Sequence, residues 1–124
     1  VLLRRIVGAR ATPPHVPLRL LDPEGRATRI LKTPGHTPGG CTFLFHDGAD
    51  VGLFGDSLFH LSVGRTDLGG DARVYARTIR DVILALSDET VVHSGHGPSS
   101  TMAVERAMNP FLNGDVSLDA PGGW

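Results

Sequence analysis

Two apolar segments separated by a tight turn constrain the fold of this chain most strongly. The segments CTFLFH (41–46) and DVGLFGD (50–56) are joined around DGA. Short apolar runs on either side of such a turn are typical of a β-hairpin. Their hydrophobicity is almost continuous, which predicts strands that are buried on both faces or nearly so. We therefore expect a fold built around this hairpin, with other elements covering it.

The rest of the pattern extends this hairpin into an α/β fold with a mainly antiparallel sheet and two helices. Residues 16–33 contain two β-favouring runs around the turn PEG, which predicts a first hairpin. Apolar residues recur at helical spacing over 75–86, and Asp71 is a suitable N-cap. A short strand over 89–93 and a second helix over 99–108, stopped by Pro110, complete the order.

Composition excludes several classes of protein. The chain has 124 residues, a formal net charge of −1 and a charged fraction of 20%, so it is one domain at most and carries no basic surface for nucleic acid. No apolar run approaches the roughly 18 residues of a membrane span. The single cysteine, Cys41, excludes an intramolecular disulfide and fits a reducing compartment. We therefore expect a cytoplasmic protein without nucleic-acid or membrane partners.

Three predicted loops each place one candidate metal ligand beside glycine. His36 lies between prolines and glycines in TPGHTPGG, Asp56 follows VGLFG, and His96 lies in SGHGPSS. Each comes directly after a predicted strand, so the three side chains are expected to converge at one edge of the sheet. Neutral imidazoles and a carboxylate suit zinc, manganese or iron. The joint pattern therefore predicts a metal site.

Each of these residues also has an ordinary interpretation. His36 alone would fit a solvated histidine in a tight turn, and Asp56 alone a turn or cap residue. The loop around His96 leads into a helix N-terminus, whose free N–H groups bind anions or are capped locally. The remaining histidines in the strands and loops, His46, His60 and His93, are expected not to be ligands.

Four stretches resemble the metallo-β-lactamase fold superfamily, close to its glyoxalase II-like branch, the hydroxyacylglutathione hydrolases. They are TPGHTPGG, LFGDSLF, GRTD and SGHGPSST with ERAMNPFL. The resemblance covers residues 16–112 and implies an αββα sandwich with two metal ions, commonly zinc, at the edge between its sheets. It implies that His36 ligates the first metal, His96 the second, and that Asp56 bridges both as the catalytic carboxylate. Hydroxide held by the metals would attack a thioester or ester carbonyl.

The family motif T-H-x-H-x-D-H is not found in this chain. It lies upstream of the TPGH loop in the family and supplies four further ligands, but in residues 1–35 only His15 stands near its place. We therefore expect 1–15 to be a segment of uncertain structure, 16–112 the C-terminal portion of a truncated domain, and 113–124 a flexible tail. Truncation, a misplaced start codon and true loss are all open. Such a portion is expected to have doubtful activity and to self-associate through an exposed sheet face.

The substrate and two alternative functions stay open at this point. Arg65 in GRTD is a candidate contact for an anionic substrate, and it could equally pair with Asp67 or Asp71 to hold the loop. One alternative is a persulfide dioxygenase-like enzyme with a single iron ion. The other is a catalytically dead remnant that serves as an interaction module. Cys41 is expected to be a small buried residue rather than a nucleophile.

Overall fold

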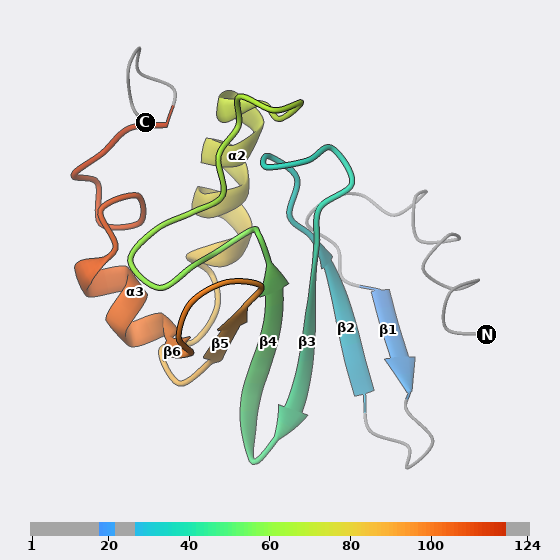
Figure 1. The fold of residues 1–124 in the computed structure, drawn as a ribbon. Coiled ribbons are helices and arrows are strands. Elements are labelled where there is room, and N and C mark those ends of the chain that lie inside the picture. The colour runs from blue at the N-terminus through green and yellow to red at the C-terminus, as the bar shows by residue number, and fades with distance from the viewer. Residues whose placement is uncertain (1–17, 22–26, 119–124) are drawn as a thin grey trace.

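The computed structural model describes residues 18–21 and 27–118, and these form one sheet with helices beside it (Figure 1). The sheet has six strands in the order β1-β2-β3-β4-β5-β6. Its strands are β1 (Leu18–Leu21), β2 (Ala27–Lys32), β3 (Cys41–Asp47), β4 (Ala49–Gly55), β5 (Val91–Ser94) and β6 (Ser100–Thr101). The helices are α2 (Ala72–Thr78), the π-helix η2 (Ile79–Ile83) and α3 (Met102–Met108).

Both predicted hairpins are confirmed. Strand β1 pairs antiparallel with β2, and β3 pairs antiparallel with β4 across the turn at Gly48. The turn of the first hairpin lies in residues 22–26, outside the described residues, as does the segment 1–15. Among the described strands, only β4 and β5 pair in parallel, because α2 and η2 carry the chain back to the starting edge.

The prediction that the central strands are buried on both faces is wrong. Leu44 and Phe54 are 1% exposed on the face that packs against the helices, whereas Leu53 on the opposite face is 44% exposed. Phe43 lies opposite Leu53 in the register and is only partly buried. Helices cover one face, and the apolar side chains of the other face remain partly open. Toward β2 this face closes again, since Ile30 is 2% exposed.

Both helices begin where the sequence indicates, and the first helical stretch ends earlier than the apolar spacing suggests. The Asp71 carboxylate accepts hydrogen bonds from the backbone N–H groups of Arg73 and Val74, which caps α2. The Leu84 N–H then donates to the Ile79 carbonyl at 2.9 Å, a π-type bond that ends the helical stretch before the predicted residue 86. Helix α3 begins after its cap Thr101 and ends before Pro110, as predicted.

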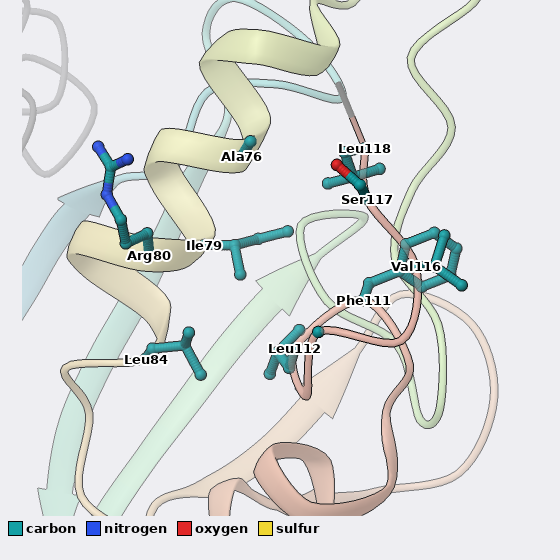
Figure 2. A pocket seen from close by; sticks show the side chains of 10 residues that line it. Ala76, Ile79, Arg80, Leu84, Phe111, Leu112, Val116, Ser117 and Leu118 are labelled. Atoms are coloured by element: carbon teal, nitrogen blue, oxygen red, sulfur yellow. The ribbon is translucent and has the colours of Figure 1, made fainter. Parts of the chain in front are cut away.

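The core lies between the sheet and the helices, and the C-terminal segment closes one side of it. Phe54, Tyr75, Ile83 and Val92 share a buried cluster with Leu118. The predicted tail 113–124 is described only to residue 118, and that residue is 6% exposed. Figure 2 shows an apolar hollow between α2, η2 and residues 111–118. No helix within the described ranges is long and apolar enough to cross a membrane.

Candidate metal centre

The three predicted ligand residues follow strands that run in the same direction. Strand β3 is antiparallel to both β2 and β4, and β4 is parallel to β5, so β2, β4 and β5 all end at the same edge of the sheet. His36 follows β2, Asp56 follows β4 and His96 follows β5. An irregularity in the β4–β5 register between Leu53 and Gly55 shifts the end of β4.

The Asp56 carboxylate lies between the two histidines, with one imidazole at each oxygen. His36 Nε2 is 3.2 Å from Oδ2, and His96 Nε2 is 3.5 Å from Oδ1. The Gly95 N–H donates to the Gly55 carbonyl at 2.8 Å and so ties the two loops together. Among the described residues, no three His, Cys, Asp or Glu side chains are grouped around one point that could hold a metal ion. The arrangement is instead two histidine–carboxylate pairs that share Asp56.

The partner of the other His36 nitrogen fixes what Nε2 can do. Nδ1 lies 2.6 Å from the backbone carbonyl of Arg65, which can only accept, so Nδ1 carries the proton. In the neutral ring Nε2 then has a lone pair, and this lone pair faces a carboxylate oxygen. Two acceptors in this position require a cation or a second proton between them. The donor set therefore fits a divalent metal, and the carbonyl orients the ring as outer partners of metal-bound histidines do.

The phenol of Tyr75 is hydrogen-bonded to the backbone of the loop that follows Asp56. Tyr75 is fully buried, and its O–H donates to the Ser57 carbonyl at 2.7 Å while it accepts from the Gly64 N–H at 3.0 Å. Burial, aided by the charge of Asp56, raises the pKa of Tyr75 far above its ordinary value, although the Gly64 N–H opposes this rise. Sequence reasoning assigned Tyr75 only to the apolar stripe of the helix. A tyrosine among core residues is itself a signal, because a buried hydroxyl needs a partner.

The raised pKa predicts how stability changes at high pH. Tyr75 is the only tyrosine, so its absorbance reports one group. In the unfolded chain it ionises near pH 10, whereas the folded chain keeps it neutral, so stability is full below about pH 10 and falls as the pH rises further. We expect tyrosinate absorbance to appear together with the loss of circular dichroism. A smooth titration near pH 10 in the folded chain would contradict this.

Gly64 lies against both the Asp56 loop and the His36 ring. A Cβ at this position would be 2.3 Å from the Asp56 carbonyl oxygen and 2.8 Å from His36 Cγ. Gly64→Ala is therefore expected to destabilise the fold by about 1–3 kcal/mol and to displace His36. Chemical denaturation measures the first effect. Gly39→Ala is the matched control, because a Cβ there meets nothing within 4 Å, and equal losses in both variants would refute the explanation.

Arg65 contributes to the site through its backbone. Its guanidinium pairs with the Asp67 carboxylate, with Nε 2.6 Å from Oδ1. Of the alternatives that the sequence left open for Arg65, the structure therefore has the ion pair within the loop. This hydrogen bond lowers the pKa of Asp67. The Arg65 carbonyl, by contrast, accepts from His36. Asp71, the other candidate partner, caps α2 instead.

The other described histidines and Cys41 have partners elsewhere. His46 Nδ1 is 3.2 Å from Asp50, His60 Nδ1 is 2.8 Å from Glu105 and His93 Nδ1 is 2.6 Å from Ser99. The Cys41 thiol is only partly buried, less than its predicted core position, and partial burial raises its pKa. His15 lies outside the described residues.

Several curated proteins have related sequences, although no protein-family model matches the chain. An uncharacterized protein of Mycobacterium leprae is 51% identical over 76% of this chain and 44% of its own length. The probable metallo-hydrolase YqgX of Bacillus subtilis is 45% identical over 68% of this chain and 40% of its own length. Hydroxyacylglutathione hydrolase GloC of Haemophilus influenzae is 40% identical over 76% and 44%, respectively. The chain thus spans less than half the length of these relatives.

Solved structures share the fold as well as the sequence. The BLEG-1 B3 metallo-β-lactamase superposes with a TM-score of 0.70 at 41% identity, over 76% of this chain and 44% of its own. The chain belongs to the metallo-β-lactamase superfamily. The chain also resembles TTHA1623 in a di-iron-bound form. The TM-score is 0.62 at 40% identity, over 86% of this chain and 57% of TTHA1623. ETHE1 from Myxococcus xanthus has a TM-score of 0.71 at 28% identity over 87% and 47%. The predicted α/β fold class is confirmed.

Proposed function

We propose that this chain supplies one half of the metal centre of a glyoxalase II-like metallo-hydrolase that acts on thioesters or esters. The observation that carries the proposal is the position of Asp56, with His36 at one carboxylate oxygen and His96 at the other. A carboxylate with an imidazole at each oxygen suits a bridge between two cations. The name of the relative GloC supports the thioester class.

The residues of the chain would have different roles in such a metal site. His36 and Asp56 would hold one divalent metal, and Asp56 and His96 the other, with zinc the proposed ion and iron or manganese the alternatives. A bound metal of this kind activates water and polarises a carbonyl group. The Arg65 carbonyl keeps the lone pair of His36 directed at the site. A contact between the Arg65 side chain and an anionic substrate would require the ion pair with Asp67 to open.

The remaining ligands would come from outside the described residues. Each proposed metal position would have only one histidine and one oxygen of Asp56, whereas catalytic zinc usually has three protein ligands. We propose that the first half of a metallo-β-lactamase domain supplies the rest and covers the open sheet face around Phe43 and Leu53. Self-association through this face is the proposed outcome when that half is missing. A dead remnant stays as the alternative if no such half exists.

A persulfide dioxygenase-like iron enzyme is the second candidate. Two histidines and one carboxylate are also the ligand types of mononuclear iron sites, and the similarity to a di-iron-bound structure favours iron as a ligand-compatible metal. Against this candidate, the two histidines face different oxygens of Asp56, and no shared point for one ion exists among the described residues. The hydrolase is therefore the better-supported function.

The nucleophile distinguishes this proposal from cysteine chemistry. With the first half of the domain supplied, we expect hydrolysis of a glutathione thioester that is lost on chelation and restored by zinc. Cys41→Ala should retain the rate within about twofold, because the proposed nucleophile would be water and not a thiolate. The assay is thiol release, measured beside oxygen consumption with glutathione persulfide in an iron-loaded sample. Oxygen consumption without thiol release would assign the dioxygenase instead.

A further inference from the structure

A fully buried carboxylate lies in the core beside the loop that follows Asp56. Glu105 on α3 is 0% exposed and accepts four hydrogen bonds. Its Oε1 accepts from the Leu61 N–H at 2.7 Å and from Asn109 Nδ2 at 3.0 Å. Its Oε2 accepts from Ser100 Oγ at 2.6 Å and from His60 Nδ1 at 2.8 Å. Burial alone would raise the pKa of Glu105, but these hydrogen bonds together lower it, so the group stays charged.

The partners of Glu105 hold one tight turn, Phe59–Ser62. Phe59 and Ser62 exchange backbone hydrogen bonds at 3.0 and 3.3 Å, and Leu61 between them has φ = 63°. A left-handed leucine is strained and persists only where its surroundings impose it. Here the Leu61 N–H is held by Glu105, and Asn109 Nδ2 donates to the carbonyls of Phe59 and Ser62 at 3.3 and 3.0 Å.

The turn presents the Phe59 ring to the His96 imidazole. The two ring centroids are 5.8 Å apart with the planes at 73°, an edge-to-face contact. His96 needs such support because its side chain is 77% exposed, whereas that of His36 is 25% exposed. Glu105 also holds Ser100, just beyond the loop that carries His96. Both connections from the buried carboxylate lead to the same ligand candidate.

We propose that Glu105 is a positioning residue for His96: it fixes the Phe59–Ser62 turn, and the Phe59 ring of that turn sets the orientation of the His96 imidazole. The inference deepens the proposed function, on which it rests only in giving His96 a metal to bind. The contact between Phe59 and His96 can be measured without metal. Failure of this inference is therefore distinguishable from failure of the proposed function.

The experiment compares four variants of the 124-residue chain by NMR, each metal-free and then titrated with zinc alone. Glu105→Met keeps the length of the side chain and removes every acceptor, whereas Glu105→Gln keeps one oxygen for the turn. Phe59→Leu removes the last link and leaves the buried carboxylate intact, which keeps the test informative if Glu105→Met does not fold. Asp88→Asn is the control. Asp88 pairs with Arg106, which lies on the same helix as Glu105, and Asp88 does not contact the Phe59–Ser62 turn.

We expect the cross-peaks between Phe59 and His96 to be lost in Glu105→Met and largely recovered in Glu105→Gln. The zinc concentration that shifts the His96 signals should rise about 10-fold in Glu105→Met and in Phe59→Leu, with the His36 response unchanged. Asp88→Asn should match the parent chain. Equal weakening at His36 and His96, or intact cross-peaks in a folded Glu105→Met, would overturn the inference. Silence of both histidines toward zinc in the parent chain, with the cross-peaks behaving as expected, would instead count against the proposed metal centre and leave the positioning role of Glu105 intact.

Discussion

Replacing Asp56 by asparagine is expected to lower the zinc affinity of the chain by about 100-fold or more. Loss of an outer partner of a ligand already costs about 10–100-fold, and Asp56 would be a ligand to both metals. Its two oxygens face His36 and His96, so no other described carboxylate can take its place between them. Isothermal calorimetry or competition with a chelating dye measures the change.

The matched control for this variant is Asp50→Asn. Asp50 lies at the opposite end of β4, where it pairs with Arg29 at 3.5 Å and with His46 at 3.2 Å. The substitution removes the same charge at the other end of β4, and the net charge changes equally in both variants. Zinc affinity should therefore be unchanged in Asp50→Asn. A similar loss in the two variants would mean that zinc binds by general electrostatic attraction and not at the shared carboxylate.

Supplying the first half of the domain is expected to raise thioester hydrolysis from near background by several orders of magnitude. In the chain alone, each histidine shares a single carboxylate and the described residues offer no further ligand at this edge. Catalytic metals require more protein ligands than this to keep a defined open position. The comparison is between the 124-residue chain and a version preceded by a segment that contains T-H-x-H-x-D-H, assayed for bound zinc and thiol release.

The same comparison tests the open sheet face. Leu53 is 44% exposed and its neighbour Phe43 is partly exposed, so the chain alone is expected to associate, whereas the extended version should sediment as a smaller, defined species. A Leu53→Lys variant of the short chain serves as control, because a charge at this position should reduce association without touching the loop edge. A monomeric short chain that binds two zinc ions and hydrolyses as fast as the extended one would refute the incomplete-site explanation.

The strands and helix starts could be predicted because short-range sequence determines them. The DGA turn and the capping carboxylate of Asp71 act within a few residues of the chain, and both features are found where the pattern places them. The exposure of Leu53 could not be predicted from its hydrophobic run, because the run does not say what lies opposite. The π-type turn at Ile79 also has no signal in the apolar spacing, since Ile83 and Leu86 fit a regular helix equally well.

The candidate ligands and their convergence at one sheet edge could be predicted, but the distances between them could not. Glycines and strand ends mark His36, Asp56 and His96 in the sequence. Their mutual distances depend on the parallel pairing of β4 with β5 and on the irregularity at the end of β4, which are tertiary features. The family resemblance implied that Asp56 lies between His36 and His96, whereas the distances that place each imidazole at its own carboxylate oxygen come only from the folded chain.

The supporting residues were missed because they look like ordinary helix positions. Tyr75 fits an apolar stripe, and Glu105 fits the solvent face of a short helix. One signal for Glu105 was available: Asn109 follows it at i+4, which places a carboxylate and an amide side by side on one helix face. The hydrogen bonds between Glu105 and the turn, by contrast, connect residues more than 40 positions apart, as from Leu61 to Glu105. Local sequence patterns do not encode them.

The parallel pairing of β4 with β5 has a consequence for the order in which the protein folds. β2, β3 and β4 form a meander that is connected by residues 33–40 and by Gly48, and local hairpins form within microseconds. β5 can pair with β4 only after residues 56–90, which include α2 and η2, have brought the chain back to β4. Closing a longer loop costs more chain entropy and is slower. His36 and Asp56 are therefore expected to approach each other early, and His96 to arrive last. Partly folded chains would hold the first pair of ligands well before the second.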